Sequence, residues 1–300
     1  MSLIDAQKLA AANVSFRTSF FKALQDAPRK YEDIVTKVPS NSPSEIYKWL
    51  GRMPMMREWI GERVAHKLAA NSHTITNKDW EATLEVDRDD LRYDKLGMVM
   101  PQISDLASAD PRKKDELIFA LLTAGFADTY GVCYDGQNLF DTAHKAFGPS
   151  DASQSNTVTT ALGATALDAG IKAMNEFTGD DGKRLNIDPT HIVFGPALRA
   201  QVRTLLKAER DASGATNTQM GLLEPVMSSQ ITGNEWFLLD QSKAVRSIIL
   251  QEVGGVNFVS KNAPNDEGVF WDKTFYWGVD STFNAGYGLW QTCYGSTGAG

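Results

Sequence analysis

The chain has 300 residues, of which 42% are hydrophobic and 22% charged, and its net charge at neutral pH is −7. This composition is typical of a globular protein with enough apolar material for a sizeable core. No run approaches the roughly 18 apolar residues of a membrane span, and the acidic excess argues against a protein whose main task is to grip nucleic acid.

The charge and the cysteines add two expectations. Residues 1–67 hold 11 of the 30 Lys and Arg and 7 of the 37 Asp and Glu, a balance of +4, which leaves −11 for the rest. A basic arm on an acidic body suits a polyanion or an acidic neighbour, and equally a solvated helix surface. The start lacks the regions of a signal peptide. Cys133 and Cys293 are expected to be buried thiols in a reducing cytoplasm.

The first sixty or so residues are predicted to form an arm. Apolar side chains recur there at the spacing of an amphipathic helix, which Pro28 ends. An extended connector between Pro39 and Pro43 follows, and Ser42 with Pro43 indicates the start of a short helix through Ile46 to Leu50. The helical spacing is carried by Leu9, Asn13, Phe16, Phe20 and Leu24.

A charged ribbon comes next, between residues 79 and 94. Its apolar and polar residues alternate, as in a strand with one wet face. With few large apolar residues, such a ribbon is marginally stable alone and is expected to lie on a neighbouring subunit. The alternating pairs are Trp80-Glu81, Ala82-Thr83, Leu84-Glu85 and Val86-Asp87.

A long apolar helix is predicted after the ribbon. Asp110 is a suitable N-cap, Pro111 suits the first position, and Gly131 marks the end. The ribbon and this helix together are typical of a protein that associates with copies of itself.

The second half reads as an α/β unit followed by an aromatic sheet. Asp135-Gly136 predicts a tight hairpin turn, and residues 148–160 a boundary loop. A helix over 162–177, a strand over 192–194, a helix after Pro196 and strands over 236–239 and 247–253 form the α/β unit. The last fifty residues are rich in aromatic side chains with glycines between them, which predicts a twisted antiparallel sheet.

Catalytic and ligand-binding motifs are weak. Gly182-Lys183 lacks the rest of a phosphate loop, and the carboxylates of residues 179–188 lack the pattern of a calcium loop. The histidines lack metal-ligand spacing. Asp141 lies three residues before His144 and offers an acid/base pair, although a surface or interface hydrogen bond is far commoner for such a pair. We expect no catalytic residue, no metal and no cofactor.

Four segments, in their order and spacing, give the chain a resemblance to a known family. It is similar over nearly its full length to the major head subunit of Mu-type tailed phages and prophages, the gene-T product family. The segments are Thr76-Asn77-Lys78-Asp79-Trp80-Glu81 with Arg88-Asp89-Asp90, the run from Asp135 to His144, the run from Asp188 to Val193, and Tyr287-Gly288-Leu289-Trp290.

The resemblance implies an α+β chain with the tailed-phage capsid fold, called the Hong Kong ninety-seven fold. On this basis residues 1–68 form the N-terminal arm and residues 69–101 an extended β-ribbon loop. Residues 102–149 and 254–300 form a peripheral domain with a long spine helix, and residues 150–253 form the axial domain.

The function implied is that of a major capsid protein, found in the virion and made in the cytoplasm of the host bacterium. Copies would form pentamers and hexamers of an icosahedral shell around double-stranded DNA, which they contact weakly. Expected partners are a scaffolding protein, a portal and a decoration protein, without a membrane. Scaffold and protease are expected to be separate proteins. The subunit contacts are predicted at Trp80, Glu81, Arg88, Arg92, Phe16 and Phe20.

Two other functions stay open at this point. An encapsulin-like nanocompartment would use the same fold around a protein cargo. An enzyme of the α/β hydrolase kind would be built on Asp141, His144 and Asp180, whose side chains include a carboxylate and an imidazole suited to proton transfer.

Overall fold

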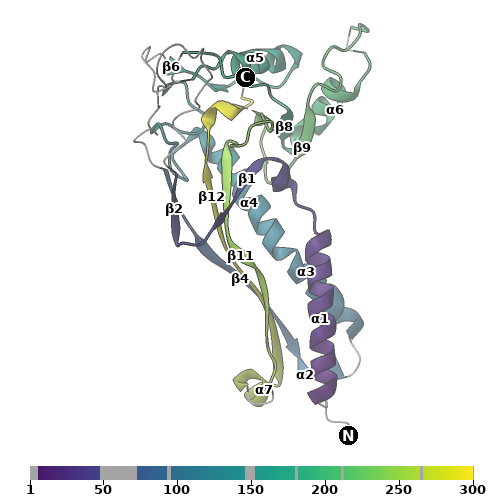
Figure 1. Ribbon diagram of the computed structural model, residues 1–300. Helices are drawn as coiled ribbons and strands as arrows, with labels where there is room; N and C mark the ends of the chain where they lie inside the picture. Colours follow the sequence, from purple (N-terminus) through teal and green to yellow (C-terminus); the bar gives the residue numbers. More distant parts are fainter. Residues whose placement is uncertain are drawn as a thin grey trace, which may run out of the picture.

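The computed structural model describes residues 6–47, 73–92, 96–145, 153–179, 182–210, 213–263 and 266–299. The protein is elongated, with a long hairpin and helices at one end and a smaller sheet with two helices at the other (Figure 1). The mixture of helices with mostly antiparallel strands confirms the predicted α+β class.

A four-stranded sheet forms the long part of the molecule. Its order is β1 (Val35–Ser40), β11 (Ile248–Lys261), β12 (Thr274–Tyr287) and β4 (Lys78–Asp87). Strands β11, β12 and β4 run antiparallel, whereas β1 runs parallel to β11. The predicted aromatic sheet near the C-terminus is therefore confirmed by the long β11–β12 hairpin.

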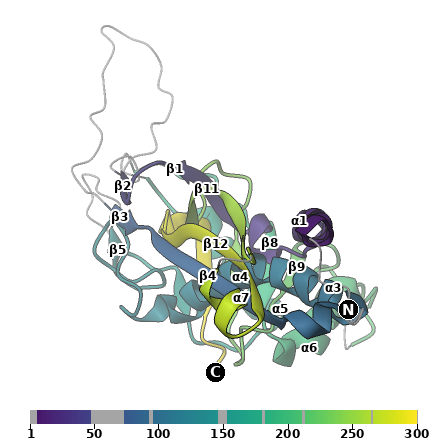
Figure 2. The same cartoon turned by 90° about the horizontal axis from the view of Figure 1, so that it is seen from below.

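Three helices cover one face of this sheet. They are α1 (Ala6–Asp26), α3 (Leu96–Ala107) and α4 (Ala109–Thr123). Seen from below, α1, α3 and α4 lie on the same side of the strands (Figure 2). Around the fully buried Trp277, an apolar cluster joins Phe16 and Phe20 of α1 to Ile103 of α3. The amphipathic N-terminal helix is thus confirmed.

A five-stranded sheet forms the other end. Its order is β7 (Thr157–Val158), β13 (Cys293–Ser296), β10 (Trp236–Leu239), β8 (His191–Phe194) and β9 (Glu224–Met227). Helices α5 (Ala164–Glu176) and α6 (Arg199–Lys207) belong to this end, as predicted. A Cβ at Gly170 of α5 would lie 2.9 Å from Leu238 of β10, so the missing side chain lets the helix sit close to the sheet.

Short elements complete the fold. Strands β2 (Ser44–Tyr47) and β3 (His73–Thr76) form one small sheet, and β5 (His144–Lys145) and β6 (Ser153–Gln154) another. The single turns are η1 (Lys30–Asp33), η2 (Ala124–Phe126), η3 (Pro196–Leu198) and η4 (Trp290–Thr292), and the short helices are α2 (Arg88–Arg92) and α7 (Glu267–Trp271).

One predicted helix is wrong, and a second is present with a different cap and a different end. The segment after Ser42 and Pro43 is strand β2, because it pairs with β3, a partner distant in sequence; the predicted continuation to Leu50 lies outside the described residues. The long helix α4 begins at Ala109 and ends at Thr123, well before Gly131. Asp110 does not cap it, since its carboxylate is buried against other side chains.

The ribbon also differs from its prediction. Strand β4 has the expected alternation of half-buried and exposed residues. However, it pairs along its whole length with β12 of the same chain, and its apolar face packs against the cluster around Trp277. Residues 88–92 and 96–107 are helical, and residues 69–72 and 93–95 lie outside the described residues. The apolar face of β4 is therefore covered within one protomer, whereas the opposite face is exposed.

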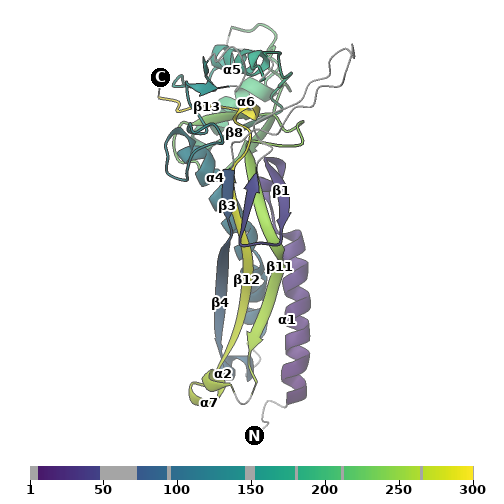
Figure 3. The same ribbon diagram turned by 60° about the vertical axis from the view of Figure 1, so that its left-hand side comes forward.

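The strands cross the predicted division into domains. Strand β11 includes residues 248–253, which the prediction gave to the axial domain, yet it lies in the four-stranded sheet. Strand β13 belongs to the range 254–300, yet it lies between β7 and β10 in the five-stranded sheet. Pairing between distant segments decides this arrangement, and Figure 3 shows the chain passing between the two ends several times.

Candidate subunit interface

Trp80 and Glu81 lie at the start of β4, beside an open cavity. The Trp80 ring stacks on Phe283 with 5.6 Å between ring centroids, and its Nε1 donates to the Phe283 carbonyl at 3.0 Å. Lys113 Nζ lies 4.7 Å from the centre of the indole ring, a cation–π geometry. Glu81 is exposed, and its carboxylate accepts a hydrogen bond from Thr83 Oγ1 at 2.8 Å.

The cavity, which we call the Trp80 cavity, has a volume of about 650 Å³. It lies between the start of β4, the first half of α4, the middle of β12 and residues Ser228–Gln230. Its lining combines apolar groups with charged ones of both signs. The apolar members are Trp80, Ala82, Ala109, Val279 and Phe283. Sites that hold a partner's side chain have this mixed character.

The two arginines lie at the far end of the same strand. Arg88 follows β4 as the first residue of α2, and its amide donates to the Lys273 carbonyl at 2.8 Å. Its side chain is half-buried. Arg92 ends α2, and its side chain lies outside the part that the structure describes. The predicted cluster is therefore split, with Trp80 and Glu81 at one end of β4 and Arg88 at the other.

Phe16 and Phe20 are wrong as contact residues. Only 1% of Phe16 and 0% of Phe20 is exposed. Phe16 meets Trp277 edge-on at 5.2 Å, and Phe20 lies 4.7 Å from Phe258. The apolar stripe on α1 covers its own sheet, which leaves these two rings no surface for a neighbour.

A buried ionic cluster, which sequence reasoning missed, joins α4 to the hairpin. Lys114 Nζ lies 2.9 Å from Asp110 Oδ2 and 2.6 Å from Glu252 Oε1. Ser281 donates to Asp110 Oδ1 at 2.7 Å. Burial, followed by the negative charge of Glu252, raises the pKa of Tyr31 beside this cluster. The i,i+4 spacing of Asp110 and Lys114 was the available signal.

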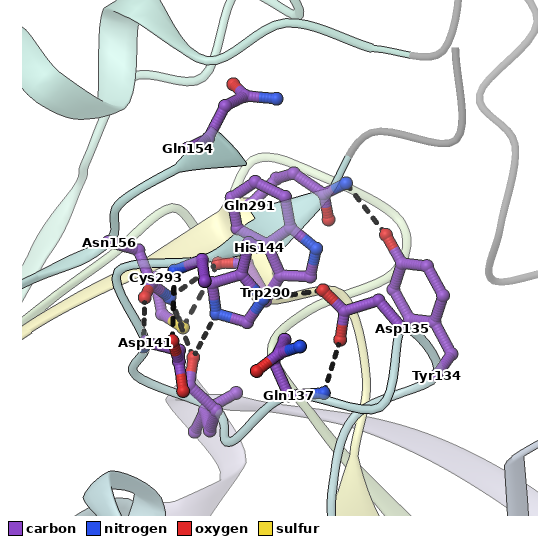
Figure 4. Close-up of polar contacts among 12 residues, drawn as sticks. Tyr134, Asp135, Gln137, Asp141, His144, Gln154, Asn156, Trp290, Gln291 and Cys293 are labelled. Atoms are coloured by element: carbon purple, nitrogen blue, oxygen red, sulfur yellow. Dashed lines mark hydrogen bonds and ion pairs between the residues drawn. The ribbon is translucent and has the colours of Figure 1, made fainter. Parts of the chain in front are cut away.

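A second buried cluster shows that the proposed acid/base pair of Asp141 and His144 does not form. His144 Nδ1 lies 2.7 Å from Asp135, not from Asp141, and its Nε2 lies 3.2 Å from the Leu139 carbonyl. The ring stacks on Trp290 at 4.2 Å (Figure 4). Asp141 instead accepts from the amide of Ala143.

The histidine therefore has a structural role. His144 and Asp135 are fully buried, so no substrate reaches them. The turn at Asp135-Gly136 forms as predicted, with Gly136 at φ +81°. Its flanks are not the strands of a hairpin. Asp180, the third residue of the proposed hydrolase site, lies outside the described residues.

The two thiols are buried and free, as predicted. Burial raises the pKa of Cys133 and of Cys293 well above its ordinary value. Within the described residues, the side chains form no group of three or more His, Cys, Asp or Glu that could hold a metal ion. A separate search of these residues finds no helix that is long and apolar enough to cross a membrane.

Comparison with solved structures gives the class of protein. The chain matches a subunit of the procapsid of bacteriophage JBD30 with a TM-score of 0.63 and 31% identity, over 98% of this chain and 76% of that one. A capsid of the same phage, decorated with minor capsid protein trimers, matches with a TM-score of 0.53 and 27% identity over 69% of this chain and 92% of that one. The fold is that of a tailed-phage capsid subunit.

The family follows from the sequence itself. The model of the family described as Mu-like prophage major head subunit gpT matches residues 9–161, 153–231 and 225–299, and the chain belongs to this family. It is 31% identical to the Mu-like prophage FluMu major head subunit of Haemophilus influenzae, over 98% of this chain and 74% of the relative. Identity to the major capsid protein of Escherichia phage Mu is 29%, over 96% and 73%. The protein is a structural capsid protein and not an enzyme.

Proposed function

We propose that copies of this chain form the pentamers and hexamers of an icosahedral head that encloses double-stranded DNA. The observation that carries the proposal is the likeness to a procapsid subunit, in sequence and in fold, along almost the whole chain. An elongated protomer with a cavity half-way along its length also suits a shell, in which each copy must touch several others through different surfaces.

We assign the two ends of the protomer to different places in a capsomer. The four-stranded sheet with α1, α3 and α4 is the peripheral part, and α4 is its spine helix. The five-stranded sheet with α5 and α6 is the axial part near the capsomer centre. The pairing of β13 with β7 and β10, and of β11 with β1 and β12, supports giving β13 to the axial part and β11 to the peripheral part.

The subunit contacts are proposed on the exposed face of β4 and at its two ends. Glu81 and Arg88 offer charges that would set the register between neighbours more than the affinity. Reversing Arg88 and Arg92 to Glu should block or deform shell assembly and leave the circular dichroism spectrum of the protomer unchanged. Normal heads from this variant would contradict the assignment.

The proposed partners beyond the chain itself are a scaffolding protein and a portal during assembly. A decoration protein is a further one, since the JBD30 capsid carries minor capsid protein trimers. Contact with packaged DNA should be weak, because a subunit with a net charge of −7 neutralises few phosphates. The finished protein would reside in the virion after synthesis in the cytoplasm of a host bacterium.

Electron microscopy and light scattering of the full chain, expressed alone and with its scaffolding protein, test the proposal. The expected result is closed, regular shells of hundreds of copies. A small oligomer under both conditions would contradict it. Shells from cells that carry the complete phage should protect double-stranded DNA from nuclease, whereas a nanocompartment would hold protein cargo.

A further inference from the structure

The four-stranded sheet carries a row of carboxylates on the face that points away from the helices. Side chains alternate between the two faces along a strand, and every residue of β4 that points to this side is exposed. Four of them are acidic: Asp79, Glu81, Glu85 and Asp87. Asp280 of β12 joins them, because it lies directly opposite Glu81 in the register of the two strands. We call this surface the outer sheet face.

The charge of the outer sheet face is not balanced within the protomer. The hydrogen bonds that its carboxylates accept come from neutral donors, such as Asn257 Nδ2 to Asp280 at 3.0 Å. In the cross-strand rows that contain the carboxylates, Lys261 of β11 is the single cation. Like charges directly opposite each other, as Glu81 and Asp280 are, destabilise a sheet. Cations from outside the protomer would relieve this repulsion.

The middle of the outer sheet face is flat and partly apolar. Thr83, Gly278 and Val259 form one row across the three strands, between the row of Glu81 and the row of Glu85. A Cβ at Gly278 would lie 3.3 Å from Val259 and 3.5 Å from Thr83, so the missing side chain keeps the surface low between them. Val259 is 51% exposed. The outer sheet face thus offers an apolar strip with carboxylates on both sides.

The outward face of α1 has the complementary character. Its exposed side chains recur at helical spacing, on the side away from the buried stripe that covers the sheet. They include Val14, which is 68% exposed, and Phe21, whose ring has the Arg17 guanidinium 5.6 Å from its centre. Between positions 11 and 25 the charged residues are Arg17 and Lys22, without an acidic one. The outward face of α1 is therefore basic, with exposed apolar groups among its cations.

We infer that the outward face of α1 in one copy of the chain docks on the outer sheet face of a second copy. The inference rests on the proposed function, because it names the surface that meets the exposed face of β4. Phe21 would cover the apolar strip, and Arg17 and Lys22 would approach the carboxylates beside it. The two surfaces have the same length, since the residues of α1 and of β4 each span roughly 30 Å.

The placement of the two surfaces suits a closed ring. Helix α1 lies on one side of the four-stranded sheet and the outer sheet face on the other (Figure 2), and both follow the long axis of the molecule (Figure 3). A copy that docks its α1 therefore keeps its own outer sheet face open for the next copy. Such a contact repeats head to tail and can close into a ring. A different basic partner would neutralise the carboxylates but would leave the Phe21 ring uncovered.

Charge reversal with rescue is the first test. Arg17→Glu with Lys22→Glu, and separately Glu81→Lys with Glu85→Lys, should each lower the yield of closed shells about tenfold or more, because like charges would then face each other across the contact. The chain with all four substitutions should regain closed shells. All four positions are exposed, so circular dichroism and urea unfolding of the protomers should stay unchanged.

The matched control adds Arg203→Glu and Lys207→Glu, at two exposed positions of α6, to the Glu81→Lys and Glu85→Lys chain. This chain has the same net charge as the rescued one and should not regain shells. Normal shells from either reversed pair, or no recovery in the chain with all four substitutions, would overturn the inference. Equal recovery in the control would overturn it too, because net charge alone would then explain the effect.

Cross-linking locates the contact without a change of charge. Thr18→Cys places a thiol on the outward face of α1, and Thr83→Cys places one on the outer sheet face, where both threonines are exposed. The chain's own thiols are buried and unreactive. With a short bismaleimide, shells of the double variant should give multimers on a denaturing gel, whereas either single variant should not.

In the control, Thr204→Cys replaces Thr18→Cys. Both threonines are exposed helix residues that donate to the carbonyl four positions earlier, and Thr204 lies on α6 at the other end of the molecule. Shells of the Thr18→Cys and Thr83→Cys chain without multimers, or equal multimers from the control, would overturn the inference. If the unchanged chain formed no shells at all, the proposed function would fail as well. Normal shells without the cross-link would refute the docking of α1 alone.

Discussion

Replacing Lys114 with Met is expected to destabilise the protomer strongly. The ammonium group is buried, its side chain only 8% exposed, and it lies within 2.9 Å of two carboxylates, those of Asp110 and Glu252. At an effective dielectric constant of 20, each attraction amounts to about 6 kcal/mol before the cost of desolvation. Methionine keeps the length and packing of the side chain, so the substitution isolates the charge.

The expected loss is about 3–5 kcal/mol, since Asp110 and Glu252 remain behind as two buried or half-buried negative charges without a cation. This is a large part of the roughly 5–15 kcal/mol that stabilises a domain. Urea unfolding of the unassembled protomer, followed by circular dichroism, measures the loss.

The adjacent lysine is the matched control. Lys113 pairs with Glu116 at 2.9 Å, but these side chains are 33% and 54% exposed. Lys113→Met should therefore change the free energy of unfolding by at most about 1 kcal/mol. Equal stabilities of the Lys114→Met and Lys113→Met chains would refute the idea that the buried cluster holds α4 on the hairpin.

Three further outcomes are expected. Leu121→Asp should give insoluble protein, because Leu121 is only 1% exposed and the substitution would bury an unpaired carboxylate there; a soluble, folded variant would show that this position is open to solvent. Burial lowers the pKa of His73 below its ordinary value of 6.5. Because the unfolded chain then binds a proton at His73 more readily than the folded chain, the free energy of unfolding should fall as the pH drops through 6.5. His73→Gln should reduce that fall, measured by urea unfolding at several pH values. Cys133 and Cys293 should resist a thiol reagent at pH 8 until the chain unfolds, since burial raises the pKa of each.

Local patterns in the sequence were sufficient to predict several elements. The alternation from Trp80 to Asp87 gave the correct strand and the correct wet face, because a period of two is visible in the residues themselves. The spacing of Phe16 and Phe20 gave a correct helix. The sequence did not show which surface the apolar face of β4 or of α1 packs against. The apolar face of β4 and the apolar stripe of α1 belong to the same buried cluster of one protomer. From the sequence alone, both had been assigned to contacts with a neighbouring subunit.

Pairing between distant residues explains the other errors. Ser and Pro in sequence, as at Ser42 and Pro43, can begin either a turn or a helix. The segment after them is a strand because it pairs with β3, which begins about thirty residues later at His73. Asp141 is near His144 in sequence, but its carboxylate accepts a hydrogen bond from the backbone amide of Ala143. The imidazole of His144 is hydrogen-bonded to Asp135 instead. Short polar side chains often bind nearby backbone in this way.

The buried ionic cluster lies where the hairpin changes its surroundings. Phe283, Ala285 and Tyr287 of β12 belong to the apolar cluster that continues into the five-stranded sheet. Phe275, Trp277 and Val279 belong to the cluster under α1 and α3. Ser281, between them, bonds to Asp110. On the facing strand, the register shifts between Val253 and Asn257, beside Glu252.

The polar layer therefore separates two apolar cores that share one hairpin. Gly254 in the shifted segment has φ +67°, which lets the strand bend there at little cost. Without Lys114, the carboxylates of Asp110 and Glu252 would repel each other at this bend, and the two ends of the protomer would lose their common alignment. A shell needs that alignment, because each copy must present its contact surfaces at fixed positions to close.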